Sequence, residues 1–136
     1  MAKQLSPNLW EQNLCRLVDF GHSFSPLIEM QSHKNELPLS HGEAVILDVY
    51  LSCLISNNRS ILSNEEFIKI STLIDKLGLN KYHPMFLDLN YLQKALDEIT
   101  AHRNGHQNLP LPTRIGAAKF YNDIQTNDLE QAIKRM

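Results

Sequence analysis

Apolar residues recur along most of this chain at intervals of three and four residues, which places them on one face of an α-helix. The spacing predicts long helices over about residues 8–21, 42–57, 63–77 and 88–102, and a last short helix over residues 127–136. Ser25 and Pro26 predict a further helix start, because proline lacks the N–H group that has no partner in a first turn. If a helix instead runs through this point, Pro26 bends it by removing a hydrogen bond. The pattern is typical of a mainly helical protein.

The second of these long helices is the most apolar segment of the chain. Only Asp48, Ser52 and Ser56 interrupt it, and their four-residue spacing places them on one narrow stripe. A helix that is apolar on most sides is expected to lie at the centre of a fold. It would hold His41 and Glu43 rigidly at its N-terminus, where a negative charge such as that of Glu43 is favourable.

Capping residues mark the ends of the later helices, which are expected to be purely structural. Ser63 and Glu66 form a capping box, in which side chains satisfy N–H groups of the first turn. Gly78 is placed to end that helix. Its inward face is predicted to consist of Phe67, Ile70, Leu73, Ile74 and Leu77. The other predicted caps are Asp88, before a stripe of leucines, and Asn127 with Glu130.

A small β element is predicted after the helix over residues 88–102. Asn104 and Gly105 indicate a tight turn, and residues 107–112 and 114–121 are expected to pair as extended segments. Prolines in the first segment would confine it to the edge of a sheet. The predicted fold class is therefore mainly α with a small β-hairpin near residues 107–121. No glycine-rich phosphate loop follows a strand, so the sequence predicts no nucleotide site of its own.

Length and composition indicate one domain of a cytoplasmic protein. The chain has 136 residues and a net charge of −2, so nothing indicates nucleic-acid binding. No run of about 18 apolar residues predicts a membrane span, and the first residues lack the apolar core of an export signal. Cys15 and Cys53 both fall in apolar helical surroundings. They are expected to be buried free thiols in a reducing compartment.

The candidate chemistry lies in histidines. His22 and His41 each stand beside a glycine and each opens a predicted helix, so rigid elements could present two imidazoles to a divalent metal. A catalytic zinc needs at least three protein ligands, and the spacing of the six histidines offers no third. Capping or buried structural imidazoles are the alternative interpretation of the pair. His33, in a polar surface loop over residues 31–38, and His83 are expected to be loop residues.

The motifs DFGHSFSP at residues 19–26, Glu29 and HGEAV at residues 41–45 resemble the signature of the dehydroquinate synthase-like sugar phosphate cyclases. The resemblance implies that His22 and His41 are two ligands of a catalytic zinc or cobalt ion. In that family the third ligand is a glutamate well upstream of the FGH motif, which these 136 residues do not contain. The resemblance also implies that residues 1–136 are a single partial domain, part of the C-terminal helical domain of that fold.

Two positions separate this chain from the dehydroquinate synthases themselves. Asp19 stands where those enzymes have asparagine, and Pro26 where they have a second histidine. The GHSFSP form is similar to the branch that cyclises sedoheptulose 7-phosphate, which includes 2-epi-5-epi-valiolone and desmethyl-4-deoxygadusol synthases. The segment RNGHQNLPLP at residues 103–112 is most similar to the valiolone-forming members. Desmethyl-4-deoxygadusol synthase and 3-dehydroquinate synthase remain the alternatives within the family.

This resemblance implies an enzyme, a lyase that uses NAD without net redox change to convert sedoheptulose 7-phosphate to a cyclitol with loss of phosphate. The NAD would be bound mainly by an N-terminal half or separate subunit that is absent from this chain, and the complete enzyme would be a homodimer. Asp19 would be a catalytic residue that contacts a substrate hydroxyl. His102 and Arg103 stand where dehydroquinate synthases bind phosphate through a lysine pair, and the fork of Arg103 suits a phosphate. Without the family, Arg103 is equally a cation at a helix C-terminus.

The isolated chain is expected to be inactive, because it lacks a metal ligand and the NAD site. Two other interpretations stay open. The chain could be one subunit of a split cyclase, or an inactive or truncated remnant whose helices act as an assembly module. The retained His22, His41 and Arg103 favour maintained chemistry. No nucleic-acid or membrane partner is expected.

Overall fold

The computed structural model describes residues 23–34, 38–102 and 104–136. The helix predicted over residues 8–21 and the thiol of Cys15 lie outside these ranges. The elements in order are α2 (Ser25–Ser32), α3 (His41–Asn58), α4 (Asn64–Lys76), the 3-10 helix η2 (Pro84–Leu87), α5 (Leu89–His102), β1 (Leu109–Arg114), β2 (Ala117–Tyr121) and α6 (Thr126–Ile133). The predicted class, mainly helical with one hairpin, is confirmed.

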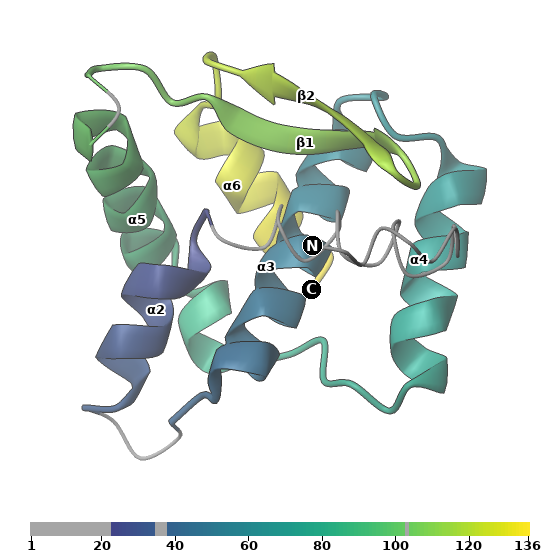
Figure 1. Ribbon diagram of the computed structural model, residues 1–136, viewed down its shortest axis with the longest axis horizontal. Helices are drawn as coiled ribbons and strands as arrows, with labels where there is room; N and C mark the ends of the chain where they lie inside the picture. Colours follow the sequence, from purple (N-terminus) through teal and green to yellow (C-terminus); the bar gives the residue numbers. More distant parts are fainter. Residues whose placement is uncertain (1–22, 35–37, 103) are drawn as a thin grey trace, which may run out of the picture.

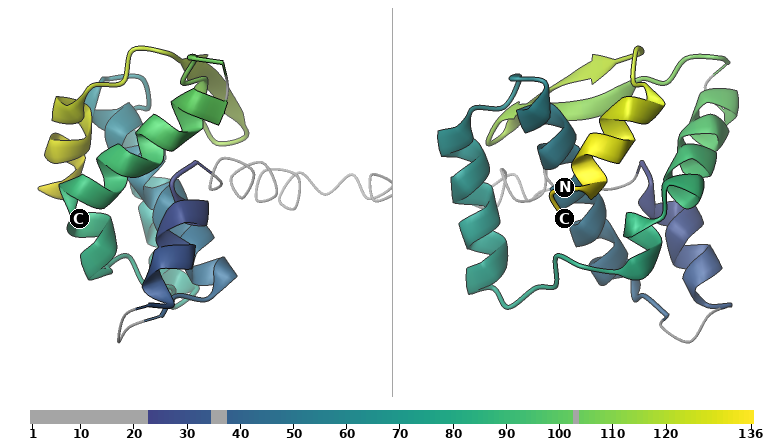
Figure 2. Two further views of the ribbon diagram at one scale, coloured as in Figure 1. Left: turned by 90° about the vertical axis from the view of Figure 1, so that its left-hand side faces the viewer. Right: turned by 180° about the vertical axis from the view of Figure 1, so that it is seen from behind.

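Helix α3 is the centre of the described fold. In Figure 1, α2 and α5 lie on one side of it, α4 lies on the other, and the hairpin crosses above. Seen from behind in Figure 2, α6 lies against it. The buried residues of α3 are Ala44, Val45, Leu47, Asp48, Val49, Tyr50, Leu51, Ser52, Cys53, Leu54, Ile55 and Ser56. The prediction of a central helix is confirmed, and its polar stripe is buried with the rest. None of the helices in the described ranges is both long and apolar enough to span a membrane.

Local caps define where α3 begins. The Ser40 hydroxyl accepts from the Glu43 N–H at 3.2 Å, and the Ser40 N–H donates to the Glu43 carboxylate at 2.9 Å. These bonds with Ser40 hold the pKa of Glu43 below its usual value. The predicted structural role of Glu43 in the first turn is therefore confirmed. Deep in the same helix Cys53 is a buried free thiol, as predicted, and burial raises its pKa to about 12.

Several local predictions need correction. The predicted surface loop begins too early, since α2 extends to Ser32, whose buried hydroxyl binds the Glu29 carbonyl and the Leu39 N–H. Leu77 was placed inward but is 56% exposed at the end of α4. His83 lies in a loop, as predicted, but it is buried and caps η2, where its Nδ1 atom accepts from the Met85 N–H.

The predicted caps of α4 and α6 are confirmed only in part. At α4 the Ser63 hydroxyl accepts from the Glu66 N–H, but the Glu66 carboxylate accepts from the Ile115 N–H in the hairpin instead of completing a box. The glycine after α4 has a φ of +70°, in keeping with its predicted role as a helix stop. The last helix is capped by Gln125, whose N–H donates to Asp128 at 2.8 Å, and not by the predicted Asn127.

The hairpin forms as predicted but is packed more deeply than an edge strand implies. Strand β1 pairs antiparallel with β2, and the first four residues of β1 are buried. The Ser56 hydroxyl of α3 donates to the Pro112 carbonyl, which fixes β1 to the central helix. Asn104 and Gly105 both have positive φ, which confirms the turn ahead of the strand.

Arg59, just after α3, joins the central helix to the C-terminal part of the chain. Its guanidinium donates to both carboxylate oxygens of Asp128 at 3.0 and 2.8 Å. It also donates to the side chain and the carbonyl of Asp123, both at 2.9 Å. The side chains of Arg59 and Asp128 are only 20% and 17% exposed. The Arg59 bond holds the pKa of Asp128 below its usual value.

We predict that Arg59→Ala lowers the free energy of unfolding by about 2–3 kcal/mol at pH 7, because it leaves a largely buried carboxylate without its cation. The effect depends on pH. Since the pKa of Asp128 is lowered in the folded state, its stabilisation is present at neutral pH and is lost as the pH falls from about 4 through that lowered pKa. Urea unfolding of both proteins at pH 7 and pH 3 measures the difference.

The matched control is Lys69→Ala. Lys69 also lies near two carboxylates, those of Glu65 and Glu66, but at 3.6 Å and with its side chain 58% exposed. Its loss is expected to change stability by less than about 0.5 kcal/mol. Equal effects of the two substitutions would show that Arg59 is an ordinary surface cation.

Candidate functional site

The N-terminus of α2 is held by a carboxylate from α3. Asp48 is fully buried, and its Oδ2 atom accepts from the backbone N–H groups of Phe24 and Ser25, both at 2.7 Å. The N-cap position belongs to Phe24, whose side chain cannot cap. Ser25 is therefore the first residue of α2 and not its predicted cap, and Pro26 takes the second position, where it needs no partner.

Burial makes this carboxylate unusual. Desolvation raises the pKa of Asp48 to about 7, although the N–H groups of Ser25, Phe24 and Ser23 oppose the rise. No Lys or Arg side chain of the described ranges forms an ion pair with it. Backbone donors and the positive end of the α2 dipole therefore offset the cost of burial. The segment that follows His22 is thereby attached to the central helix.

A second carboxylate makes the reverse connection, from α2 to the start of α3. The Nδ1 atom of His41 lies 2.9 Å from Oε1 of Glu29. Because a carboxylate can only accept, Nδ1 carries the proton in this hydrogen bond. Metal-binding histidines very often donate one ring N–H to a carboxylate in this way, which fixes the orientation of the ring. The His41 side chain is 66% exposed and that of Glu29 is 26% exposed, so the pair lies at the protein surface.

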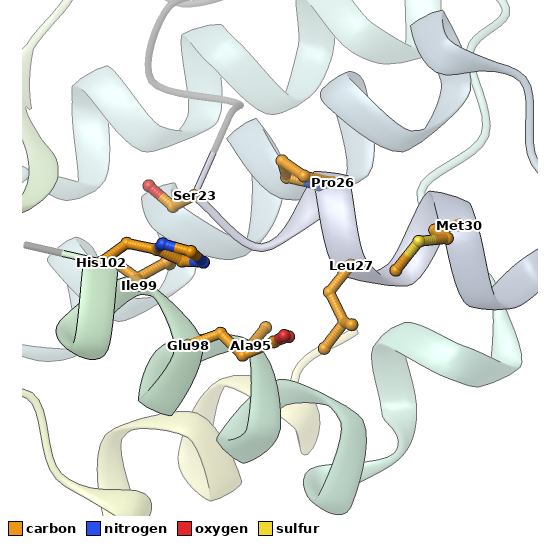
Figure 3. Close-up of a pocket in the computed structure, with 8 residues that line it drawn as sticks. All are labelled: Ser23, Pro26, Leu27, Met30, Ala95, Glu98, Ile99 and His102. Carbon is orange, nitrogen blue, oxygen red and sulfur yellow. The ribbon is translucent and has the colours of Figure 1, made fainter.

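The other side of α2 lines a pocket of about 360 Å³ shared with α5 (Figure 3). His102, at the end of α5, and Ser23 lie together at one end of it, and Met30 lies at the opposite end. The remaining lining residues are Pro26, Leu27, Ala95, Glu98 and Ile99. The predicted substrate residue His102 is thus brought close to the motif that contains His22, although about 80 residues separate them in sequence.

Of the predicted site residues, the structure describes His41 and His102, and both lie beside α2. Asp19, His22 and Arg103 are outside the described residues, so their predicted roles remain predictions. Within the described ranges no three His, Cys, Asp or Glu side chains gather as a metal site. Sequence reasoning missed the contacts of two carboxylates. Glu29 is part of the family motif, but the sequence assigns it no role. Asp48 is one of the polar residues of the central helix, and no local signal in the sequence indicates its distant partner.

Comparison with known proteins identifies the family of this chain. The family model described as 3-dehydroquinate synthase C-terminal matches residues 1–101. The chain therefore belongs to the dehydroquinate synthase-like family, as the motifs predicted.

Individual members of the family differ in how similar they are to this chain. A 2-epi-5-epi-valiolone synthase from Actinomyces sp. is 42% identical over 100% of this chain and 35% of its own length. A demethyl-4-deoxygadusol synthase from Trichormus variabilis is 35% identical over 93% of this chain and 30% of its own length. The solved structure of ValA, the 2-epi-5-epi-valiolone synthase of Streptomyces hygroscopicus subsp. jinggangensis 5008, matches 95% of this chain and 35% of its own with 41% identity and a TM-score of 0.79. That structure has NAD⁺ and Zn²⁺ bound. The chain spans about a third of the length of these relatives.

We predict that Glu29→Ala shifts the imidazole of His41 from the Nδ1–H toward the Nε2–H tautomer, because the carboxylate that holds the Nδ1 proton is gone. Nitrogen-15 chemical shifts of the histidine rings measure the tautomer directly. The control is Glu98→Ala, which removes an exposed carboxylate of α5 that lines the pocket. An unchanged His41 tautomer in Glu29→Ala would contradict the assigned hydrogen bond.

Proposed function

We propose that this chain is the metal- and substrate-binding portion of an NAD-dependent sugar phosphate cyclase. The complete enzyme converts sedoheptulose 7-phosphate to a cyclitol of the 2-epi-5-epi-valiolone type and eliminates phosphate, which makes it a carbon–oxygen lyase. The observation that carries the proposal is 42% identity to a 2-epi-5-epi-valiolone synthase over the whole chain. The motif residues Asp19 and Pro26, which depart from the dehydroquinate synthase pattern, support the same branch.

The metal ligands of this chain are His22 and His41. Neutral imidazoles suit Zn²⁺ or Co²⁺, and the bond from His41 to Glu29 is the second contact that metal-binding histidines usually make, so the donor set fits the ion. When bound, the ion supplies Lewis-acid polarisation of substrate oxygens. A further ligand and most of the NAD site come from a region beyond these 136 residues. The ring orientation set by Glu29 is this chain's own contribution.

The substrate residues are Asp19, His102 and Arg103. His102 lies with Ser23 at one end of the pocket between α2 and α5, which supports a binding role for this region. Arg103, the next residue in the sequence, supplies a guanidinium whose planar fork suits the phosphate group. Asp19 accepts a hydrogen bond from a substrate hydroxyl.

Substrate choice follows from two side chains. Proline at position 26 offers no donor, acceptor or charge, so this position takes no part in proton transfer or anion binding. Asp19 places a negative charge where an amide would be neutral, which disfavours a carboxylated substrate and favours a polyol. The site is therefore suited to sedoheptulose 7-phosphate and not to the carboxylated heptulosonate phosphate of the shikimate route. The complete enzyme acts as a homodimer.

We predict that a chimera restores this activity. The matching third of the Streptomyces hygroscopicus 2-epi-5-epi-valiolone synthase is replaced by residues 1–136, and cyclitol and phosphate release are measured with NAD and Zn²⁺ or Co²⁺. In the chimera, His22→Ala and His41→Ala should each lower activity more than about 100-fold, since a metal ligand is lost. His33→Ala, an exposed histidine near the C-terminus of α2, is the matched control and should change activity less than about twofold. Equal turnover of the carboxylated heptulosonate phosphate would overturn the substrate assignment, and an inactive but folded and metal-loaded chimera would favour the assembly module.

We also predict that the 136-residue chain alone binds Zn²⁺ weakly and shows no turnover. Two imidazoles fill only part of a coordination shell, and most of the NAD site lies in the other region of the complete enzyme. Calorimetric titration with Zn²⁺ and a product assay with sedoheptulose 7-phosphate and NAD test both points. Cyclitol formation by the isolated chain would contradict the division of the active site between two regions.

A further inference from the structure

Helix α2 meets α3 at two carboxylate contacts that lie about two helical turns apart. Near the start of α2, Phe24 and Ser25 donate to Asp48 of α3. Further along α2, Glu29 contacts His41 at the start of α3. The contact order is reversed between the two helices, so α2 and α3 are antiparallel neighbours. One contact involves the proposed metal ligand His41 itself, and the other involves residues two and three positions after the proposed ligand His22.

From this arrangement we infer that Asp48 is a positioning residue for the metal site. Its carboxylate fixes the backbone of Phe24 and Ser25, two and three residues after His22, to the same rigid helix that presents His41. One helix would thereby set the separation of the two ligands. The inference rests on the proposed metal role of His22 and His41.

The physical cost of Asp48 argues against a purely local cap. A serine, threonine or asparagine at the N-cap position would cap α2 without burying a carboxylate, but it would accept from the second or third helical residue and not from the N–H groups of Phe24 and Ser25. A capping residue on the same helix would hold α2 together but would leave its placement against α3 to apolar packing. The observed acceptor comes from 24 residues away and is 0% exposed. It therefore determines where the start of α2 lies as well as how it begins.

The surroundings of this contact are rigid enough for such a role. Ser23, Phe24 and Ser25 are 5%, 0% and 0% exposed, so the segment after His22 is enclosed by the core. Interiors of this kind are close-packed and transmit small displacements. Loss of the Asp48 contact would therefore displace Phe24 and Ser23, the described residues nearest to His22 in the sequence. It would also alter the Ser23 end of the pocket that contains His102.

The test uses the 136-residue chain with Co²⁺ as the probe. The dissociation constant is read from paramagnetic shifts of the His22 and His41 ring signals, which report weak binding. In the wild type both rings should respond with one dissociation constant, and His22→Ala should raise the value at His41 about tenfold. Asp48→Ala should raise it by about fivefold or more, within the range for residues that orient metal ligands. Asp48→Asn should recover most of the affinity, because its amide oxygen can accept the same two N–H groups.

A matched control separates positioning from general instability. Leu129→Ala removes a fully buried side chain on α6 and is expected to lower the melting temperature at least as much as Asp48→Ala. Its dissociation constant for Co²⁺ should stay within about twofold of the wild type, because α6 packs mainly on α3 and α5 and not on α2. If Asp48→Ala does not fold, Asp48→Glu replaces it, since the longer side chain displaces the acceptor and should likewise weaken binding.

The outcomes distinguish the two levels of inference. If His22→Ala does not weaken binding at His41, the proposed metal pair is wrong and the role of Asp48 falls with it. If His22→Ala weakens binding but Asp48→Ala and Asp48→Glu do not, only the positioning role is overturned. It is also overturned if Asp48→Asn binds as weakly as Asp48→Ala, or if Leu129→Ala weakens binding equally.

Discussion

The described fold depends on one buried carboxylate that accepts two backbone N–H groups from a neighbouring helix. Asp48 has no basic partner among the described side chains, so its charge is offset by Phe24 and Ser25 and by the end of the α2 dipole. Burying a carboxylate in this way is costly unless the donors are held in place. The contact therefore ties the start of α2 to the middle of α3. The placement of Glu29 beside His41, and of the α2 face that lines the pocket, follows from it.

The elements that sequence reasoning predicted well are those whose signals are local. The apolar run of α3, the first-turn charge of Glu43 and the Asn104–Gly105 turn each follow from a few adjacent residues. The start of α2, which was predicted wrongly, depends on a contact between distant segments. Ser25 is a residue type that often caps helices, but here Asp48 of another helix supplies the acceptor. Nothing in the spacing of residues indicates that partner.

The candidate site shows the same division. The motif residues around His22 and His41 identify the family because their spacing is specific, and the family model confirms it. The approach of His102 to Ser23 required the three-dimensional arrangement of α2 and α5. Glu29 was visible as part of the motif, but its hydrogen bond to His41 could be assigned only once the two helices were seen to be antiparallel neighbours. The candidate ligands could be predicted from residue types and motif spacing, whereas the contacts between α2, α3 and α5 could not.

The attachments of α3 also constrain how this protein can change through evolution. His41 and Asp48 of α3 contact α2, Ser56 contacts β1, and Arg59 just beyond the helix contacts α6. Inserting or deleting one residue within the helix would rotate everything beyond it by about 100°, and would break several of these contacts at once. Substitutions can be compensated one at a time, but a change in length cannot. Relatives of this chain should therefore vary in the lengths of their connections, for example near Gly78, while the interval from position 41 to position 59 stays fixed.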